Sequence, residues 1–307
     1  MSVIPDDSGL HRYRDLICDW ESFAESLDSP PPASLRVRTR KIGPEELAHR
    51  LSEQGIASHP WEWDPGILVT KHESVGATLE HWLGFYYVQE LTQTVPVRVL
   101  EPQPGERVLD LCAAPGGKTT QIAERMGNRG MLIVNEPSGR RQPALLANMN
   151  RLEVVNAVVL ARRGEEFPLG QTFDRVLVDA PCSGEGTLRK DSSMLAGASP
   201  RAVERLAKLQ KRLIARGFDL LRPGGRLVYS TCTFAPEENE AVVAELLRRR
   251  EHARVEPIAL ELPHAAGICR WNGESLHESV RGTVRIYPHH LNSGGGYVAS
   301  IRKAAPE

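Results

Sequence analysis

The sequence predicts an α/β fold built on a mostly parallel sheet and preceded by a small α+β unit. From Gly84 onward, apolar runs alternate with helical segments, and this alternation is typical of parallel strands joined by right-handed crossovers. One run, residues 173–180, is almost continuously apolar, as a strand buried on both faces requires. Before Gly84 the chain shows only a short strand–helix–strand pattern. We therefore predict two domains, residues 1–80 and residues 81–307.

Composition and charge indicate an ordinary globular protein. The chain has 307 residues, of which 41% are hydrophobic, and its 38 basic and 39 acidic side chains leave a net charge of −1. No apolar run approaches the roughly 20 residues of a membrane helix, and the first residues lack the apolar stretch of a signal peptide. The five cysteines form no C-x-x-C pair, so we predict reduced thiols, no metal and a cytoplasmic location. The near-zero net charge by itself argues against a nucleic-acid partner.

The N-terminal domain is predicted to begin with a polar, extended lead-in that ends in three prolines, Pro30 to Pro32. The segment 35–41 alternates apolar and basic residues, as a half-exposed strand does. A helix is expected to start at Pro44 and to end at a capping Gly55. A second strand is expected at 67–70. This order of a strand, a helix and a second strand predicts a small α+β unit.

The C-terminal domain is predicted to carry the alternating strands and helices. Strands are expected at 107–111, 131–136, 154–161, 173–180 and 225–231. Helices are expected at 117–126, 200–221 and 237–250, with another that ends at Leu152. In parallel sheets, ligands lie beyond the carboxyl ends of the strands. Each unusual segment of this chain falls at such an end.

The first unusual segment is DLCAAPGGKTT, which runs from Asp110 to Thr120. Small residues and two glycines separate a strand from a helix, so a ligand can approach the backbone and meet free N–H groups at the helix start. The segment has neither a Walker pattern nor G-x-G-x-x-G, which argues against a phosphate cradle. Glu136 follows the next strand. In nucleoside-binding α/β folds, an acidic residue at this place accepts hydrogen bonds from ribose hydroxyls.

Two further segments each place a cysteine at the end of a strand. DAPCSGEGTLRKD begins at Asp179 and contains Cys182, and YSTCTFAPEENE begins at Tyr229 and contains Cys232. Most isolated cysteines are small core hydrophobes. Here, neighbouring parallel strands are expected to bring both thiols and the Asp179 carboxylate to the same edge of the sheet. The pattern therefore indicates a catalytic site.

These segments resemble those of the RNA 5-methylcytosine methyltransferases of the NOL1/NOP2/Sun (RsmB/RsmF) family, and GEGTLRKD and EENE are similar to its RsmF-like bacterial branch. PASLRVRTRK resembles the family's N-terminal RNA-binding subdomain, and FYYVQE and RIYPHHLNSGGGYVASIRK also resemble family segments. The resemblance implies a class I, Rossmann-like S-adenosylmethionine-dependent methyltransferase with a mostly parallel seven-stranded sheet. It implies S-adenosylmethionine as the cofactor and RNA as the partner.

The resemblance favours ribosomal RNA, or a small-subunit assembly intermediate, as the substrate of a monomeric enzyme without membrane contact. Transfer RNA is the closest alternative, because short family members perform the same reaction on it. A non-catalytic RNA-binding assembly factor is the third reading, and the intact catalytic motifs argue against it.

The resemblance also implies the catalytic roles. Carbon 5 of cytosine is a poor nucleophile until a thiolate adds to carbon 6. By the resemblance, Cys232 is that nucleophile and Cys182 assists release, whereas DNA cytosine-5 methyltransferases use the Pro-Cys cysteine, which makes Cys182 the rival. Asp179 is the expected acid at N3 of the base and a contact to the cofactor. Lys118 is expected to hold the cytosine or to lower a thiol pKa through its charge.

The resemblance further implies that the methionine end of the cofactor lies over one turn and its ribose on Glu136. The turn consists of Cys112, Ala113, Ala114, Pro115, Gly116, Gly117 and Lys118. One departure concerns adenine, because many family members carry an aspartate at the end of the third strand, where this chain reads LARRGEEF. Arg162 or Arg163 sits there instead, and Arg163 is the candidate contact.

RNA contacts are also expected from residues outside these motifs. Arg189 and Lys190 follow the catalytic loop and are candidates for substrate contact. The basic residues of the first strand either bind phosphates or form a solvated face, and the pattern does not choose between these readings. They are Arg36, Arg38, Arg40 and Lys41. Trp61 and Trp63 have two readings, base stacking and core packing, and core packing is the more common role of Trp in a small domain.

Overall fold

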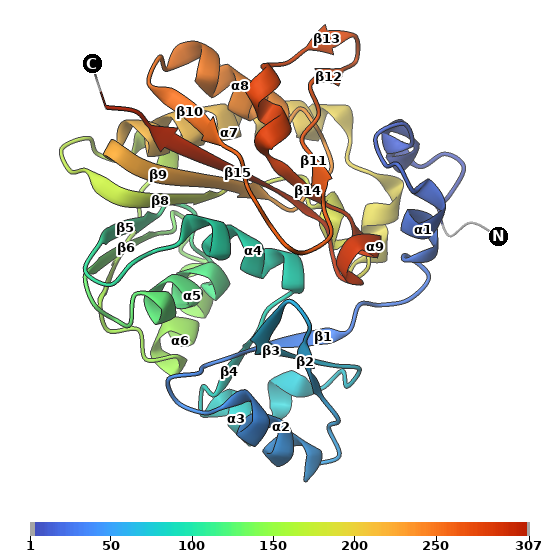
Figure 1. The fold of residues 1–307 in the computed structure, drawn as a ribbon, viewed down its shortest axis with the longest axis vertical. Helices are drawn as coiled ribbons and strands as arrows, with labels where there is room; N and C mark the ends of the chain where they lie inside the picture. Colours follow the sequence, from blue (N-terminus) through green and yellow to red (C-terminus); the bar gives the residue numbers. More distant parts are fainter. Residues whose placement is uncertain (1–3, 306–307) are drawn as a thin grey trace.

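The computed structural model describes residues 4–305 and contains one small and one large β-sheet besides a two-stranded hairpin (Figure 1). The small sheet and its helices lie at one end of the molecule, and the large sheet with its helices forms most of the rest. Helix α4 (Leu91–Leu100) follows the small sheet in the chain, packs on the large one and is mostly buried. Within the described residues, no helix is long and apolar enough to cross a membrane.

The N-terminal segment differs from the predicted extended lead-in. It forms the 3₁₀-helix η1 (Gly9–Tyr13) and helix α1 (Trp20–Glu25), which are capped by Ser8 and Asp19. Its apolar side chains pack against Leu188, Phe234 and Tyr287 of the large domain. Figure 1 accordingly places α1 beside α9 (Pro288–Leu291). The apolar residues of this segment are too few and too unevenly spaced to reveal these helices in the sequence.

The small sheet is antiparallel, with the strand order β2-β3-β1-β4. Its unit consists of β1 (Ala33–Val37), α2 (Pro44–Ser52), β2 (His59–Trp61), β3 (Asp64–Thr70), η2 (Val75–Ala77), α3 (Leu79–Trp82) and β4 (Tyr86–Val88). Leu35, Leu47 and Leu68 belong to its own core. Because β4 pairs with β1, the unit continues to residue 88 and not only to residue 80. A three-residue strand is too short to show an alternating pattern.

The large sheet has the strand order β11-β14-β15-β9-β8-β5-β6-β7, and β10 also pairs with β15. Strands β5 to β9 are parallel, as predicted, whereas β15 runs antiparallel to β9. The strands are β5 (Arg107–Asp110), β6 (Met131–Asn135), β7 (Ala157–Leu160), β8 (Phe173–Asp179), β9 (Leu221–Thr231), β10 (Ala253–Glu256), β11 (Ala265–Ala266), β14 (Val284–Ile286) and β15 (Gly296–Lys303). A separate hairpin is formed by β12 (Arg270–Trp271) and β13 (Glu274–Ser275).

The large sheet thus has nine strands in the described chain, where the resemblance implied seven. Strands β10 and β14 pair with the same edge of β15, at residues 300–303 and 296–298 respectively. They therefore share one strand position. The two-residue β11 adds one more strand beyond β14. The difference is confined to the antiparallel edge, where the strands are too short to carry a clear sequence pattern.

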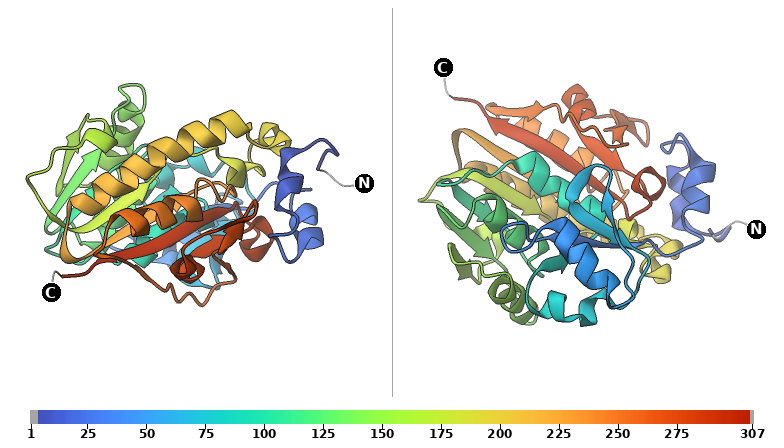
Figure 2. Two further views of the ribbon diagram at one scale, coloured as in Figure 1. Left: turned by 90° about the horizontal axis from the view of Figure 1, so that it is seen from above. Right: turned by 60° about the horizontal axis from the view of Figure 1, so that its bottom comes forward.

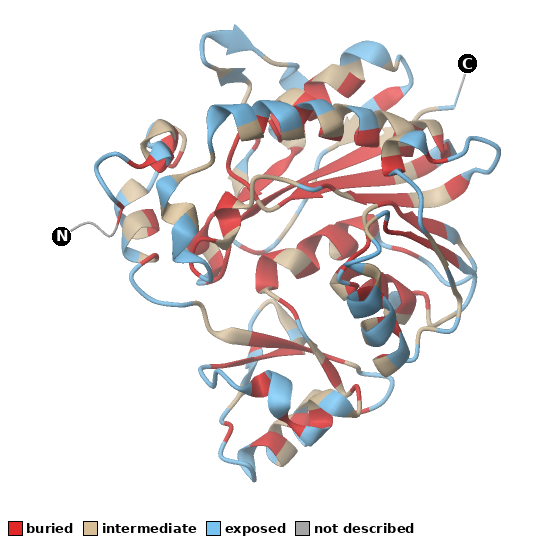
Figure 3. Ribbon diagram, turned by 180° about the vertical axis from the view of Figure 1, so that it is seen from behind, coloured by how far each residue is buried: buried red, intermediate tan, exposed pale blue. Residues whose placement is uncertain are grey.

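Helices cover both faces of the large sheet (Figure 2). Helices α4, α5 (Gly117–Arg125) and α6 (Gln142–Arg151) pack on one face, and α7 (Pro200–Asp219) and α8 (Glu240–Arg249) on the other. Neighbouring strand residues point to opposite cores, as Val108 and Leu109 do. This two-sided burial explains the continuous apolar runs and the buried strands seen in Figure 3. The remaining short helices are η3 (Gly164–Glu166), η4 (Glu185–Thr187), η5 (Ser192–Ala196) and η6 (Glu278–Gly282).

Candidate active site

The predicted site segments follow four parallel strands of the large sheet. Cys112 comes after β5, Glu136 after β6, Asp179 at the end of β8, and Cys232 after β9. Because these strands are parallel, their carboxyl ends lie along one edge of the sheet. The two cysteine segments come together there through β8 and β9, which are direct neighbours.

The two motif cysteines are in contact. Their sulfur atoms lie 3.1 Å apart, and the backbone N–H of Cys232 also donates to the sulfur of Cys182 at 3.2 Å. Both thiols are free and half-buried. The hydrogen bond from Cys182 lowers the pKa of Cys232, and the nearby Lys118 lowers it further, against the opposing effects of burial and Asp179. The same hydrogen bond, together with burial, raises the pKa of Cys182. Cys232 is therefore the thiol that ionises first.

Lys118 faces the site and not solvent. Its ammonium group lies 2.9 Å from Oδ2 of Asp179 and also donates to Oε1 of Gln93. Burial lowers the pKa of Lys118, but the Asp179 carboxylate outweighs this effect and the pKa is raised. Ser230 donates to the other oxygen of Asp179 at 2.7 Å. The site thus contains a buried cation, and both oxygens of Asp179 already accept hydrogen bonds.

The glycines of the first turn are required by backbone geometry and packing. Gly116 has a φ of 106°, which favours glycine, and a Cβ atom there would lie 3.1 Å from a methyl carbon of Leu145. A Cβ atom on Gly117 would lie 3.1 Å from the ring of Tyr87. Both glycines therefore let neighbouring side chains pack closely against the turn. This role adds a structural reason to the predicted approach of a ligand.

Glu136 is buried at the end of β6. Its carboxylate accepts hydrogen bonds from the backbone N–H groups of Ser138 at 2.9 Å and Ala114 at 3.4 Å. The exposed Arg141 lies 3.3 Å from it. This hydrogen bond from Ala114 connects the Glu136 carboxylate to the first turn.

Asp110 lies beside the predicted site residues, and the sequence interpretation assigned it no role. It is fully buried at the end of β5, where one carboxylate oxygen accepts a hydrogen bond from Thr119 at 2.7 Å. The other oxygen has no hydrogen-bond partner among the described residues. Burial raises the pKa of Asp110 to about 7, and the nearby Asp179 contributes to the rise. Its place as the first residue of DLCAAPGGKTT was the available signal.

Arg163 lies at the end of β7 with an exposed side chain. It pairs with Glu165 at 2.7 Å and with Glu166 at 3.0 Å. The backbone of its neighbour Arg162 exchanges hydrogen bonds with the side chain of Asn135. The contact of Arg163 with adenine stays a prediction.

Of the four basic residues predicted on the first strand, only Arg36 lies in β1, which ends at Val37, and three of the four contact the large domain. Arg36 is buried and donates to Gln89, to Thr120 and to Glu124, the last at 2.6 Å. Arg38 and Lys41 both pair with Glu153 of the large domain. Arg36 is buried and pairs with Glu124, so neither a phosphate-binding nor a solvated face describes it. Arg38 and Lys41 share the single carboxylate of Glu153, and Lys41 is exposed, so both readings stay open for these two residues. Arg40 alone of the set has an exposed side chain and no ion pair within residues 4–305.

The other residues predicted to contact RNA also include both buried and exposed side chains. Arg189 is buried and donates to the carbonyl oxygens of Ser29 and Ser293, so it fixes the loops around it. Its contact with substrate stays a prediction. Lys190 is exposed. Trp61 is buried in the core and Trp63 packs against it, which confirms the core interpretation of both.

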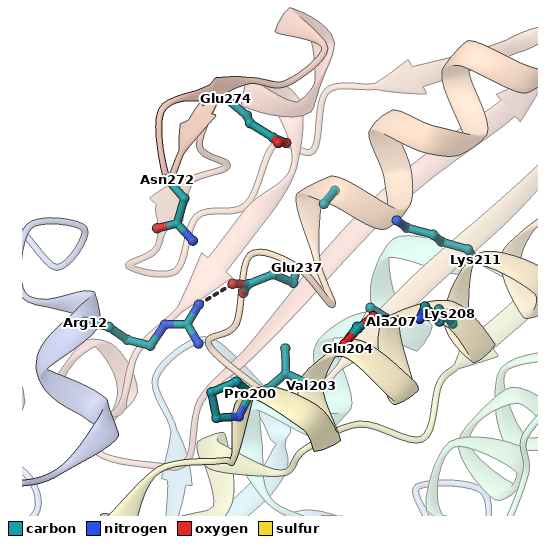
Figure 4. A pocket seen from close by; sticks show the side chains of 11 residues that line it. Arg12, Pro200, Val203, Glu204, Ala207, Lys208, Lys211, Glu237, Asn272 and Glu274 are labelled. Carbon is teal, nitrogen blue, oxygen red and sulfur yellow. Dashed lines mark hydrogen bonds and ion pairs between the residues drawn. The ribbon is translucent and has the colours of Figure 1, made fainter.

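A cleft of about 1050 Å³ lies between the small unit and the large domain. Pro30 to Pro32, Lys71, Gln89, Glu90 and Lys190 are among the residues that line it. A second cleft, of about 770 Å³, lies between η1, α7 and the β12–β13 hairpin (Figure 4). None of the predicted site residues lines this second cleft. The predicted catalytic and cofactor-binding residues line neither cleft, but Arg189 and Lys190, the predicted substrate contacts, line the first, which makes it the better candidate for a substrate path.

The fold and the site define the chain as a class I S-adenosylmethionine-dependent methyltransferase. A family model described as 16S rRNA methyltransferase RsmB/F matches residues 97–302, and one for the N-terminal domain of 16S rRNA methyltransferase RsmF matches residues 10–91. The chain belongs to the RsmB/RsmF family.

Named relatives support the same placement. The chain is 41% identical over 292 residues to the 26S rRNA (cytosine-C(5))-methyltransferase nsun-1 of Caenorhabditis elegans, covering 92% of this chain and 43% of that protein. It is 38% identical to the tRNA (cytosine(49)-C(5))-methyltransferase of Pyrococcus abyssi, covering 96% of this chain and 95% of that protein. A crystal structure of a methyltransferase homologue from Pyrococcus horikoshii superposes with a TM-score of 0.83 at 32% identity, covering 95% of this chain and 93% of that one.

Proposed function

We propose that this protein transfers a methyl group from S-adenosylmethionine to carbon 5 of a cytosine in RNA, through a covalent bond between Cys232 and carbon 6. The observation that carries the proposal is the contact of two free thiols, 3.1 Å apart, beside the ion pair of Lys118 and Asp179. This chemistry needs a thiolate to activate the ring, a group that stabilises N3, and a base that removes the proton from carbon 5.

The residues around the first turn suit S-adenosylmethionine, which supplies an electrophilic methyl group when bound. The turn Cys112–Lys118 would hold its methionine end and Glu136 its ribose hydroxyls. The unpartnered oxygen of Asp110 is a ready acceptor for an ammonium group. Arg163 would lie toward the adenine.

The first step is attack of the Cys232 thiolate on carbon 6 of the cytosine. A new carbon–sulfur bond forms, a proton from solvent is taken up at N3, and carbon 5 becomes nucleophilic. The Asp179 carboxylate, which pairs with the Lys118 ammonium group, stabilises this state by accepting a hydrogen bond from the protonated N3. This refines the expected role of Asp179, which is an acceptor here and not the proton source.

Release follows methyl transfer. The Cys182 thiol first gives its own proton to solvent, and the resulting thiolate removes the proton from carbon 5. The carbon–sulfur bond then breaks, its electron pair returns to Cys232, and N3 gives its proton to solvent. Before the reaction, the hydrogen bond with Cys232 is the largest cause of the raised pKa of Cys182. Once the sulfur of Cys232 is bonded to carbon, that effect is gone, so the pKa of Cys182 falls. Formation of the adduct thus makes Cys182 a better base than it is before the reaction.

The substrate we propose is ribosomal RNA, because both matching family models describe 16S rRNA methyltransferases. Transfer RNA is the second candidate, favoured by the archaeal relative of which this chain covers 95%. The small unit is proposed to bind RNA, with the cleft lined by Lys71 and Lys190 as its path toward the cysteines. One chain supplies all the site segments, which supports a monomer, and a reducing compartment such as the cytoplasm keeps both thiols free.

Bisulfite sequencing of total RNA tests the proposal and separates the two substrates. RNA from a strain that lacks the gene is compared with RNA from the same strain complemented with the wild type or with Cys232→Ala. The wild type is expected to restore 5-methylcytosine at a ribosomal position, and Cys232→Ala to leave it unmodified. Restoration in transfer RNA would select the second candidate. An unchanged 5-methylcytosine profile would contradict both.

A further inference from the structure

We propose that Glu238 and Gln210 are positioning residues for Cys182, which hold its thiol in line with carbon 5 of the base during release. The inference rests on the proposed function, in which Cys182 removes that proton. Glu238 lies in the loop between β9 and α8, Gln210 lies on α7, and Cys182 follows β8. Residues from three separate parts of the fold therefore meet around the loop that carries Cys182.

The two side chains hold the backbone on both sides of Cys182. Oε2 of Glu238 accepts a hydrogen bond from the N–H of Ser183 at 3.0 Å. The amide nitrogen of Gln210 donates to the carbonyl oxygen of Pro181 at 2.8 Å and to the same oxygen of Glu238 at 2.7 Å. The residues before and after Cys182 are thus fixed to one another through a single pair of side chains.

This pair is costly for stability. Both side chains are completely buried, and one oxygen of each has no hydrogen-bond partner among residues 4–305. Burial raises the pKa of Glu238 despite the bonds that it accepts. Apolar residues of similar volume would fill the same space without leaving unpartnered oxygens. Apolar residues would, however, leave the N–H of Ser183 and the carbonyl oxygen of Pro181 without these partners, so the polar pair specifically fixes the backbone on both sides of Cys182.

The neighbouring Glu237 provides a matched comparison. It belongs to the same loop, but it points into the second cleft, where it pairs with Arg12 (Figure 4). Trp271 also donates to it, at 2.9 Å. A change at Glu237 therefore removes a carboxylate from the same loop without touching the peptide groups around Cys182.

The test measures the first methyl transfer and the lifetime of the covalent adduct separately. Each variant is mixed with S-adenosylmethionine and RNA from the deletion strain, and the protein–RNA adduct is followed on denaturing gels. Glu238→Ala and Gln210→Leu are expected to accumulate adduct at least tenfold over the wild type while the first methyl transfer stays within about twofold. Glu238→Gln, which still accepts both hydrogen bonds, is expected to restore most of the release. Glu237→Ala serves as the control, with no accumulation.

Thermal melting and binding of S-adenosylmethionine identify folded variants, and Gln210→Leu carries the test if Glu238→Ala does not fold. The proposal is overturned if the folded variants release product as the wild type does. It is equally overturned if they slow the first methyl transfer as much as the release, since that is the mark of a merely structural role. Cys182→Ala is measured in parallel. If Cys182→Ala itself accumulates no adduct, the assigned role of Cys182 is wrong and the positioning role is wrong with it.

Discussion

The sulfur atom of Cys182 lies 3.1 Å from the sulfur atom of Cys232. The hydrogen bond between the two thiols lowers the pKa of Cys232 and raises the pKa of Cys182, so this contact makes two chemically identical side chains unequal. Lys118 reinforces the difference by acting on Cys232. The lowered pKa of Cys232 supports the proposal that Cys232, and not Cys182, is the nucleophile.

The charge of Lys118 is expected to set the pH at which Cys232 becomes reactive. Replacing it by methionine removes a cation that lowers the pKa of Cys232 and leaves the opposing charge of Asp179 unpaired. The pH profile of adduct formation should therefore move to higher pH. Lys208→Met, an exposed lysine on α7, is the control and should leave the profile in place. A Lys118→Met profile that coincides with that of the wild type would show that the charge does not act on the thiol.

The raised pKa of Asp110 predicts a particular dependence of stability on pH. Its pKa is about 7 in the folded protein and near 3.8 when unfolded. The folded state thus holds the proton more tightly, and this contribution to stability is complete below pH 4 and is lost as the pH rises through 7. Asp110→Asn cannot ionise, so its stability relative to the wild type should be greater at pH 8 than at pH 4, by up to roughly 4 kcal/mol. Urea unfolding at the two pH values measures this, and an equal difference at both would refute it.

The buried Arg36 is expected to be essential for joining the two units. Arg36→Met leaves Glu124 without its closest cation, which should lower the free energy of unfolding by about 3 kcal/mol. Arg40→Met removes the same charge from an exposed side chain and should change stability by less than about 0.5 kcal/mol. Denaturant unfolding compares the two. If Arg36→Met were as stable as Arg40→Met and instead reduced the salt dependence of RNA binding, Arg36 would be a phosphate contact after all.

The exposed lysines of the first cleft are expected to contact RNA phosphates. Lys71→Met and Lys190→Met should each weaken RNA binding and reduce the slope of log K against log salt by about one. Lys208→Met, on α7 and outside this cleft, is again the control. With a net charge of −1, diffuse attraction to RNA should be modest. Unchanged slopes in both variants would mean that RNA follows another path.

The sequence was sufficient to predict what depends on neighbouring residues in the chain. The parallel strands were predicted because their two-sided burial leaves continuous apolar runs, and parallel strand ends then placed Cys182 beside Cys232. The roles of Arg36 and Lys41 were not predictable in this way. Their partners lie 88 and 112 residues further along the chain, so no local pattern distinguishes a buried ion pair from a phosphate contact. Gln210 and Glu238 were missed for the same reason.

The central claim is that Cys232 forms the covalent bond to the base and that Cys182 removes the carbon 5 proton, which allows this bond to break. Nucleoside mass spectrometry of RNA incubated with the enzyme and methyl-deuterated S-adenosylmethionine, combined with denaturing gels for the adduct, tests both halves in one measurement. The wild type should yield labelled 5-methylcytidine without a lasting adduct. Cys232→Ala should yield neither product nor adduct, and Cys182→Ala should yield a stable adduct. Cys18→Ala, which changes an exposed cysteine, should behave as the wild type. Labelled 5-methylcytidine from Cys232→Ala would contradict the account.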